Sequence, residues 1–340
     1  MKAYKMLLFT FFALIISACD IFEADDNSHP VFRDGPIAFI LNSSSKTISK
    51  VSLVDPTTDN FFISLDETSS ALKFDIEGEN IWVAATEAGS IKKYSTKVSS
   101  TSPLTEIFLE DSSAPNSIVI YDGFAYVSAN NLHKVFRVDI ATGEKTSVKV
   151  GNNPQGLAIS SSTNRLFVAN SDWSTNASST ISIIDLNNFE QESKTIEIGE
   201  EFPQTFKVID DKLYVVCSKW GNPKSKVVRC NLDGEIVDVI EVVGSCFSIT
   251  EFDQHIYLNR GEEKSGLAFF HRDSTQVHYK ELGGDVFVNS LAASDNYFAL
   301  THSDGTWGSV ETLFVYFKDL ETKIRSVQVG VFASDIHILE

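Results

Sequence analysis

The chain has 340 residues, with 46 acidic and 28 basic side chains, and its formal net charge is −18 at pH 7. A surface this acidic repels nucleic acids and anionic lipid headgroups, which excludes nucleic acid as a partner. Apart from Cys19, the cysteines are Cys217, Cys230 and Cys246, an odd number without regular spacing, which excludes a disulfide framework and a zinc site. We expect three buried free thiols, with a Cys217–Cys246 disulfide as the alternative.

The N-terminal segment has the features of a secretory signal peptide. Lys2 and Lys5 give a basic start, residues 7–18 form an apolar run of 12, and small residues precede Cys19. Because so short an apolar run cannot span a bilayer, we expect residues 1–18 to be removed on export. The sequence ISAC, which ends at Cys19, resembles the lipobox of bacterial lipoproteins, in which the cysteine is diacylated and becomes the mature N-terminus. The resemblance implies that Cys19 anchors the chain in a membrane; an ordinary secreted protein is the alternative.

Residues 19–35 form an acidic segment without a strand pattern. Five carboxylates fall within the 16 residues from 20 to 35, as in a solvated tether. An acidic run directly after the lipidated cysteine also resembles the export signal that sends lipoproteins to the cell surface in bacteria of the Bacteroidota type. We therefore expect an outer-membrane lipoprotein that faces the cell surface or the periplasm. Loss of the signal peptide with its two lysines brings the net charge to about −20.

The remainder of the chain, residues 36–340, contains a repeat. A short strand with an aromatic residue at one fixed position recurs seven times, at intervals of 41 to 47 residues. A further strand follows each copy, and an apolar strand precedes most of them. A period of this length with several short strands per unit is typical of a β-propeller. We predict an all-β, seven-bladed β-propeller in which these aromatic residues pack between blades: Phe39, Trp82, Tyr126, Phe167, Tyr214, Tyr257 and Phe298.

The two ends of the repeat region predict how the ring closes. The first unit starts at Ile37 with its second strand and lacks an innermost strand, whereas the last residues, ASDIHILE, form a strand with nothing after it. Pairing the two would remove both free edges. We therefore predict that residues near 333–339 form the innermost strand of the blade that contains Phe39, so that the C-terminal strand closes the first blade.

The aromatic-containing strands resemble one known family. LFVANS, AYVSAN and LYVVCS are similar to the YVTN β-propeller repeat, and residues 167–170 carry its pattern of an aromatic residue, Val, a small residue and Asn intact. The resemblance covers essentially the whole domain and implies the fold, whereas propellers host many unrelated functions. Together with the lipoprotein start, the chain resembles the seven-bladed surface lipoproteins of Bacteroidota, one branch of which binds cobalamin beside an outer-membrane transporter. No motif here singles out that branch, so a corrinoid-like ligand and a transporter partner are implied by the resemblance alone.

Three of the connections that follow these strands are longer than the others. They come after Asn170, Cys217 and Thr301 and have 9, 8 and 10 residues, against 4 or 5 in the other blades. Each contains a tryptophan, and a loop needs a reason to hold so large an apolar ring in water. We expect a ligand platform on one face of the ring; the alternative is that each tryptophan caps its own blade. The predicted ligand-binding residues are Trp173, Trp220, Trp307, Asn170, Asp172, Asn222, Arg260 and His302.

The sequence shows no motif for catalysis, a metal or a cofactor. The seven histidines lack metal-ligand spacing, and neither a GxSxG elbow nor a phosphate-binding loop is present. We therefore predict a non-enzymatic, lipid-anchored protein that binds a small or medium-sized ligand. One alternative is a lactonase-type hydrolase with a metal above the central channel, although only Asn42 and Asn170 could act as ligands at the strand ends. Another is a scaffold that binds protein partners.

Overall fold

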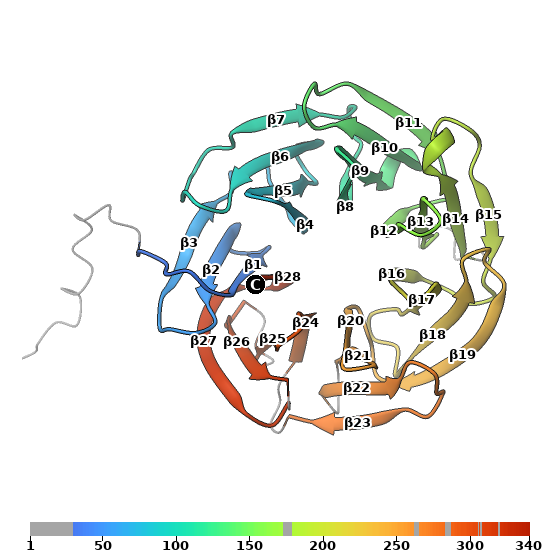
Figure 1. Cartoon of the computed structure of the whole chain (residues 1–340). Helices are drawn as coiled ribbons and strands as arrows, with labels where there is room; N and C mark the ends of the chain where they lie inside the picture. Colours follow the sequence, from blue (N-terminus) through green and yellow to red (C-terminus); the bar gives the residue numbers. More distant parts are fainter. Residues whose placement is uncertain are drawn as a thin grey trace, which may run out of the picture.

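The computed structural model describes residues 30–172, 179–261, 265–282, 287–304, 306, 308–318 and 320–340. Within this part of the chain, 28 strands form seven antiparallel four-stranded sheets. The sheets stand as blades around a central axis and close into a ring (Figure 1). The predicted seven-bladed β-propeller is therefore confirmed. We number the blades 1 to 7 in chain order, starting with the blade that contains Phe39.

Each blade has an innermost, a second, a third and an outer strand. The innermost strands of blades 1 to 7 are β28 (Ala333–Leu339), β4 (Ala71–Glu77), β8 (Pro115–Tyr121), β12 (Pro154–Ser160), β16 (Pro203–Ile209), β20 (Ile249–Phe252) and β24 (Phe287–Ala293). The second strands are β1 (Ile37–Asn42), β5 (Asn80–Ala85), β9 (Phe124–Ala129), β13 (Arg165–Asn170), β17 (Lys212–Cys217), β21 (His255–Arg260) and β25 (Tyr297–Ser303).

The third strands are β2 (Thr47–Ser52), β6 (Ser90–Ser95), β10 (Lys134–Asp139), β14 (Thr180–Asp185), β18 (Lys224–Asn231), β22 (Gly266–His271) and β26 (Val310–Phe317). The outer strands are β3 (Thr58–Ser64), β7 (Thr105–Phe108), β11 (Lys145–Lys149), β15 (Lys194–Glu197), β19 (Ile236–Val243), β23 (His278–Glu281) and β27 (Lys323–Val331). Two short 3₁₀ helices complete the described structure, η1 (Asn130–Leu132) and η2 (Leu186–Asn188).

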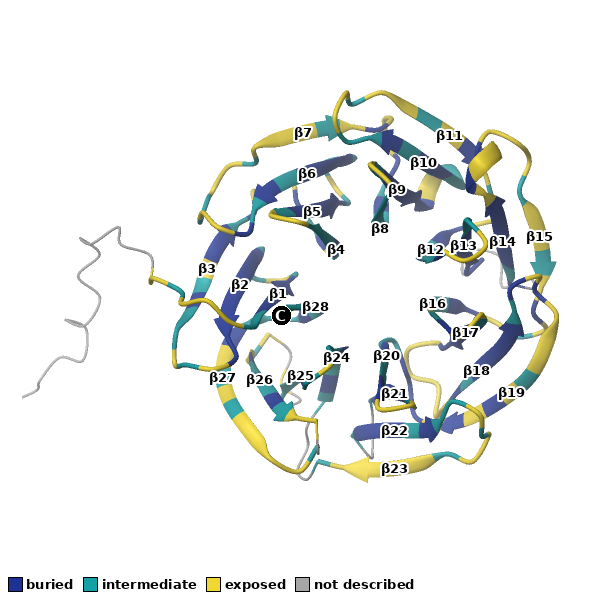
Figure 2. Cartoon of the chain, viewed as in Figure 1, coloured by how far each residue is buried: buried dark blue, intermediate teal, exposed yellow. Residues whose placement is uncertain are grey.

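The recurring aromatic residues form the core between blades, as predicted. All seven lie on second strands, and none is more than 6% exposed. Tyr257 of blade 6, for example, packs edge-on against Phe298 of blade 7 with 5.0 Å between ring centroids. Figure 2 shows the result at the scale of the ring, because exposed residues gather on the outer strands and buried ones on the strands inside them. Each blade therefore buries both of its faces against its neighbours.

Strand β28 closes the ring in the predicted way. It pairs antiparallel with β1, in a register that runs from Ile37 opposite Leu339 to Asn42 opposite Ala333. Ile336, at the centre of β28, is 4% exposed and belongs to the apolar cluster between blades 7 and 1. Closure thus combines the hydrogen bonds of a sheet with the burial of an ordinary interblade core.

The three cysteines of the propeller, Cys217, Cys230 and Cys246, are buried free thiols, as expected. Burial raises the pKa of each thiol above its ordinary value, which keeps the thiolate population low. They therefore serve as small apolar residues of the core.

Two of the predicted long connections are shorter than expected. The connection from β17 to β18 covers residues 218–223, six residues rather than eight, and that from β25 to β26 covers 304–309, six rather than ten. The reason is that the strands continue further, since Lys224 pairs with Val243 and Val310 pairs with Val331. Consequently His302 lies on strand β25 and not in a loop.

Candidate functional site

A small hollow lies on the face that carries the connections between second and third strands, which we call the loop face. The hollow has a volume of about 120 Å³ and is lined by parts of blades 1, 5 and 7. Trp220 comes from the β17–β18 connection, Phe332 from the turn between β27 and β28, and Asn289 and Glu311 from β24 and β26. The hollow therefore brings an aromatic ring and a carboxyl group together from distant parts of the chain.

Trp220 presents its ring to solvent beside this hollow. The residue is 68% exposed, and its ring stacks on that of Phe247, with centroids 5.8 Å apart and an interplanar angle of 28°. Phe247 belongs to the connection between blades 5 and 6, so the tryptophan does not fold down over the strands of its own blade. One face of the indole is thus held by protein while the residue keeps a large area free for a ligand.

Glu311 is the buried acid of the hollow. It is 2% exposed, and Asn289 donates a hydrogen bond from Nδ2 to its Oε1. Burial raises the pKa of Glu311 to about 7, although hydrogen bonds from its neighbours partly oppose the shift. The carboxyl group therefore keeps its proton to a higher pH than an ordinary glutamate, and it can donate a hydrogen bond in the hollow when protonated and accept one when ionised.

His302, a predicted ligand residue, does not line the hollow. Side chains alternate along a strand, so its neighbour Ser303 faces the hollow while His302 faces blade 6. There its ring lies 4.2 Å from the ring of Phe314, and burial lowers the pKa of the imidazole below its ordinary value. The structure gives His302 a packing role on the opposite side of the same strand.

Asn170 and Arg260, at the ends of their second strands, are also held inside the fold. Asn170 is 1% exposed and donates from Nδ2 to the hydroxyls of Thr180 and Ser182, at 3.0 and 2.9 Å. Arg260 is 4% exposed, and its Nε donates to the carbonyl of Val243 at 2.9 Å. These contacts fix the strand ends, and a role for either side chain in binding stays a prediction.

Asp172 and Asn222 complete the predicted polar residues. Asp172 is 7% exposed and accepts a hydrogen bond at Oδ1 from Asn152 at 3.4 Å. Asn222 is exposed and forms part of the turn that carries Trp220, where its Oδ1 accepts from the backbone of Lys224 at 3.3 Å. Neither lines the hollow, so of the described residues predicted to bind ligand it brings in Trp220 alone.

Two of the three tryptophans, Trp173 and Trp307, lie outside the described residues, as does Cys19. Thr306 and Gly308, which flank Trp307 in the sequence, both line the hollow. The predicted platform of three rings therefore stays a prediction for two of its members, while the third has a described position beside the hollow.

The described part of the chain offers no cluster of metal ligands, since no three His, Cys, Asp or Glu side chains there are placed to share an ion. Within the same residues, no helix has the length and apolar character needed to cross a membrane.

Sequence reasoning missed Glu311, Asn289 and Phe332. The strand pattern held a signal for the first, because Glu311 alternates in phase with Leu313 and Val315, both fully buried. The signal was missed because the predicted ten-residue connection after Thr301 included Glu311, which in the structure belongs to strand β26. Phe332 and Asn289 reach the hollow only through ring closure and a bulge in the β24–β25 pairing, for which the sequence gives no periodic signal.

Comparison with known proteins places the chain among β-propellers. No family model matches it, and no curated protein matches it either. The likeness lies in the fold. Hydrazine synthase from Kuenenia stuttgartiensis has 14% identity and a TM-score of 0.66, over 79% of this chain and 90% of that one.

Two further solved structures are similar at the same level. A quinonprotein alcohol dehydrogenase-like protein from Bacteroides thetaiotaomicron has 11% identity and a TM-score of 0.64, over 89% of this chain and 77% of that one. A catalytically inactive virginiamycin B lyase from Staphylococcus aureus, solved with quinupristin, has 12% identity and a TM-score of 0.59, over 77% and 84%. At such identities the comparisons establish a propeller similar to bacterial propellers and leave the activity open.

Proposed function

We propose that this chain is a non-enzymatic binding protein that captures a small or medium-sized ligand on its loop face. The observation that carries the proposal is the position of Trp220, whose ring is supported by Phe247 and stands 68% exposed beside a hollow with a buried acid. Exposed aromatic rings next to a concave site with few polar groups are typical of ligand-binding surfaces.

The dimensions of the site favour a ligand that is only partly enclosed. A hollow of about 120 Å³ holds one group of a larger molecule, and the remainder would lie on the indole. Glu311 would meet the enclosed group with a hydrogen bond, as a donor when protonated and as an acceptor when ionised. A flat or macrocyclic molecule with a polar substituent fits this arrangement best, and a corrinoid is one such molecule.

The proposed location is the outer membrane. The lipobox-like sequence at Cys19 and the acidic tether after it support a lipid anchor, which would hold the propeller at the cell surface or on the periplasmic side. A binding protein in that position would pass its ligand to an outer-membrane transporter.

A hydrolase is the second candidate, and a single observation favours it. A carboxyl group with a pKa of about 7 suits a general acid or base at neutral pH, and Glu311 has that property beside the proposed ligand site. This version of the enzyme hypothesis would need no metal.

The experiment is a thermal-shift screen of planar and macrocyclic ligands, with cyanocobalamin as the first probe, followed by titration of any molecule that raises the melting temperature. Each bound molecule is then recovered and analysed by mass spectrometry. Intact recovery supports a binding protein, and a product that forms with wild type and not with Glu311→Gln supports the hydrolase. A screen in which no ligand depends on Trp220 contradicts the proposed site.

A further inference from the structure

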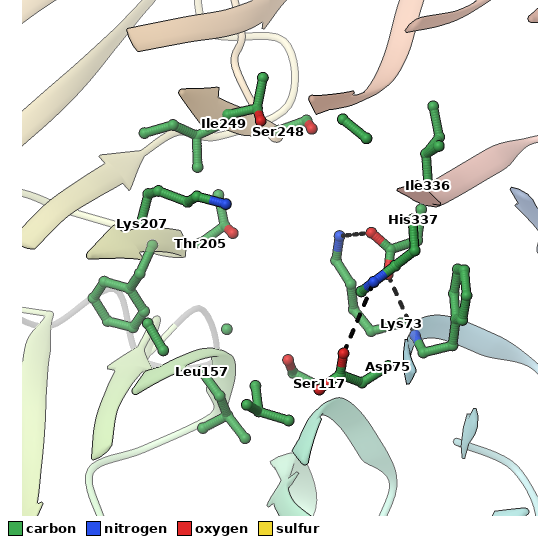
Figure 3. A pocket seen from close by; sticks show the side chains of 18 of the residues that line it. Lys73, Asp75, Ser117, Leu157, Thr205, Lys207, Ser248, Ile249, Ile336 and His337 are labelled. Atoms are coloured by element: carbon green, nitrogen blue, oxygen red, sulfur yellow. Dashed lines mark hydrogen bonds and ion pairs between the residues drawn. The ribbon is translucent and has the colours of Figure 1, made fainter. Parts of the chain in front are cut away.

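The central channel contains a second and larger cavity. It has a volume of about 470 Å³ and is lined by residues from all seven innermost strands. Figure 3 shows its charged side chains, with Lys73, Asp75 and His337 on one side and Lys207 on the other, directed toward the space between them. The loop-face hollow shares no lining residue with this cavity.

On one side the charges are already paired. Lys73 Nζ lies 2.7 Å from Asp335 Oδ1, and His337 lies between two carboxylates, 3.6 Å from Asp335 Oδ2 and 3.8 Å from Asp75 Oδ1. The same carboxylates accept backbone hydrogen bonds from neighbouring blades, Asp335 from Phe74 at 3.3 Å and Asp75 from Ile120 at 2.7 Å. These acids are therefore committed to the wall of the channel.

The imidazole of His337 responds to this setting. Burial alone lowers the pKa of His337, but the carboxylates of Asp335 and Asp75 outweigh burial and hold the pKa above its ordinary value. His337 therefore holds a proton to a higher pH than an ordinary histidine, and that proton adds a positive charge to this side of the cavity.

Across the cavity, the side chain of Lys207 has no hydrogen bond or ion pair with any residue that the structure describes. Its side chain is exposed to the channel but surrounded by protein. Burial lowers the pKa of Lys207, and the more distant carboxylates of Glu251 and Asp335 offset the shift in part. A charged ammonium in such surroundings is stabilised by a counter-ion at hydrogen-bonding distance, and none of the described side chains supplies one.

The local charge of the cavity differs from that of the whole protein. Lys73 and Lys207 balance Asp75 and Asp335, and a proton on His337 adds a positive charge, although the chain as a whole carries −18. Thr205, on the same strand as Lys207, adds a hydroxyl to the lining. The Lys207 ammonium and the Thr205 hydroxyl are donors that suit an oxygen anion, whereas both nitrogens of His337 already face carboxylates.

We propose that the central channel binds a small oxyanion, a carboxylate or a phosphate, at Lys207 and Thr205, across the cavity from the paired Lys73 and His337. The cavity volume limits the ligand to a small molecule. This site is separate from the loop-face site of Trp220, so either can fail without the other.

The test uses the full chain and two probes, inorganic phosphate and sodium malonate, each compared with sodium chloride at equal ionic strength. Acylation of lysines by an amine-reactive reagent is measured residue by residue with mass spectrometry. We expect at least one probe to slow acylation of Lys207 severalfold and to leave Lys149, an exposed lysine on outer strand β11, unchanged. The probe that protects identifies the oxyanion as phosphate or carboxylate.

Two variants with the same loss of charge complete the test. Lys207→Gln should bind the protecting probe about tenfold more weakly or worse, since it loses a charge-assisted hydrogen bond, and Lys149→Gln should bind like wild type. Labelling of wild type decides the matter even if Lys207→Gln does not fold. The proposal is overturned if neither oxyanion protects Lys207, or if both variants bind with wild-type affinity.

Discussion

Trp220 and Phe61 are both 68% exposed, but they lie on different parts of the surface. Trp220 stacks on Phe247 beside the loop-face hollow, and Phe61 lies on outer strand β3 away from it. We expect Trp220→Ala to weaken ligand binding about tenfold, since a stacked ring contributes roughly 0.5–1.5 kcal/mol beyond its buried area and about 1.4 kcal/mol is a factor of ten. Titration of each variant with the ligand found in the screen measures this.

Phe61→Ala is the matched control, because it removes an equally exposed ring from another part of the surface. It should leave the affinity unchanged, and both variants should unfold within about 0.5 kcal/mol of wild type. A large loss of stability in Trp220→Ala with unchanged affinity would show that the ring serves the fold and not a ligand.

Glu311 makes stability depend on pH in a defined direction. Its pKa is about 7 in the folded state against an ordinary value of 4.5, so between these pH values the folded chain holds a proton that the unfolded chain has released. Stability is therefore lost as pH rises through this window, by about 3 kcal/mol in total. Glu311→Gln cannot titrate, so its stability relative to wild type should increase by about that amount between pH 4.5 and about pH 8.

Urea denaturation at both ends of this pH range measures the difference. Glu281→Gln, which changes an exposed carboxylate on β23, should stay parallel to wild type throughout. If Glu311→Gln is also parallel to wild type, the acid is not held protonated in the folded state.

Among the strands, β28 is the one whose contribution to the stability of the closed ring is easiest to measure separately. Ile336 on β28 is 4% exposed between blades 7 and 1, and Ile324 on β27, the outer strand of blade 7, is 40% exposed. Strand β27 precedes β28 in the chain but is the outer strand of blade 7, whereas β28 is the innermost strand of blade 1. We expect Ile336→Ala to lower the free energy of unfolding by about 2–5 kcal/mol, because it leaves a cavity in the core. Ile324→Ala, the same chemical change, should cost less than about 1 kcal/mol. Equal losses in both variants would contradict a closed interblade core.

The strands could be predicted from the sequence because each blade repeats one local pattern. The recurring aromatic residue, such as Trp82 or Tyr214, locates the second strand of each blade. The absence of an innermost strand before Ile37 predicts that β28 takes that place. The ends of the strands were harder to predict from the sequence. Strand β26 begins at Val310, but its first residues include polar ones that are typical of loops. The central channel follows from the propeller fold, but its charged lining could not be predicted, because His337 meets Asp75 only after the ring has closed and brought β28 beside β4.

For the molecule as a whole, the proposed membrane anchor rests on the sequence alone. We expect Cys19→Ala to remain unprocessed or to be released from the membrane fraction, because the lipid would have no other attachment point. Cell fractionation together with mass spectrometry of the mature N-terminus measures both effects. Cys217→Ala, which changes a buried thiol of the core, should keep the anchor. A Cys19→Ala protein that stays mature and membrane-bound would contradict the assignment.

The pairing of β1 with β28 also sets the order in which the molecule can be completed. The two strands are separated by almost the whole propeller in sequence, so their hydrogen bonds close the longest loop in the fold. Blades 2 to 7 are each built from strands that are consecutive in the sequence, but blade 1 keeps an unpaired edge until residues 333–339 reach it. Every intermediate that lacks the β28–β1 pairing is therefore an open ring, and this pairing is the step that seals it.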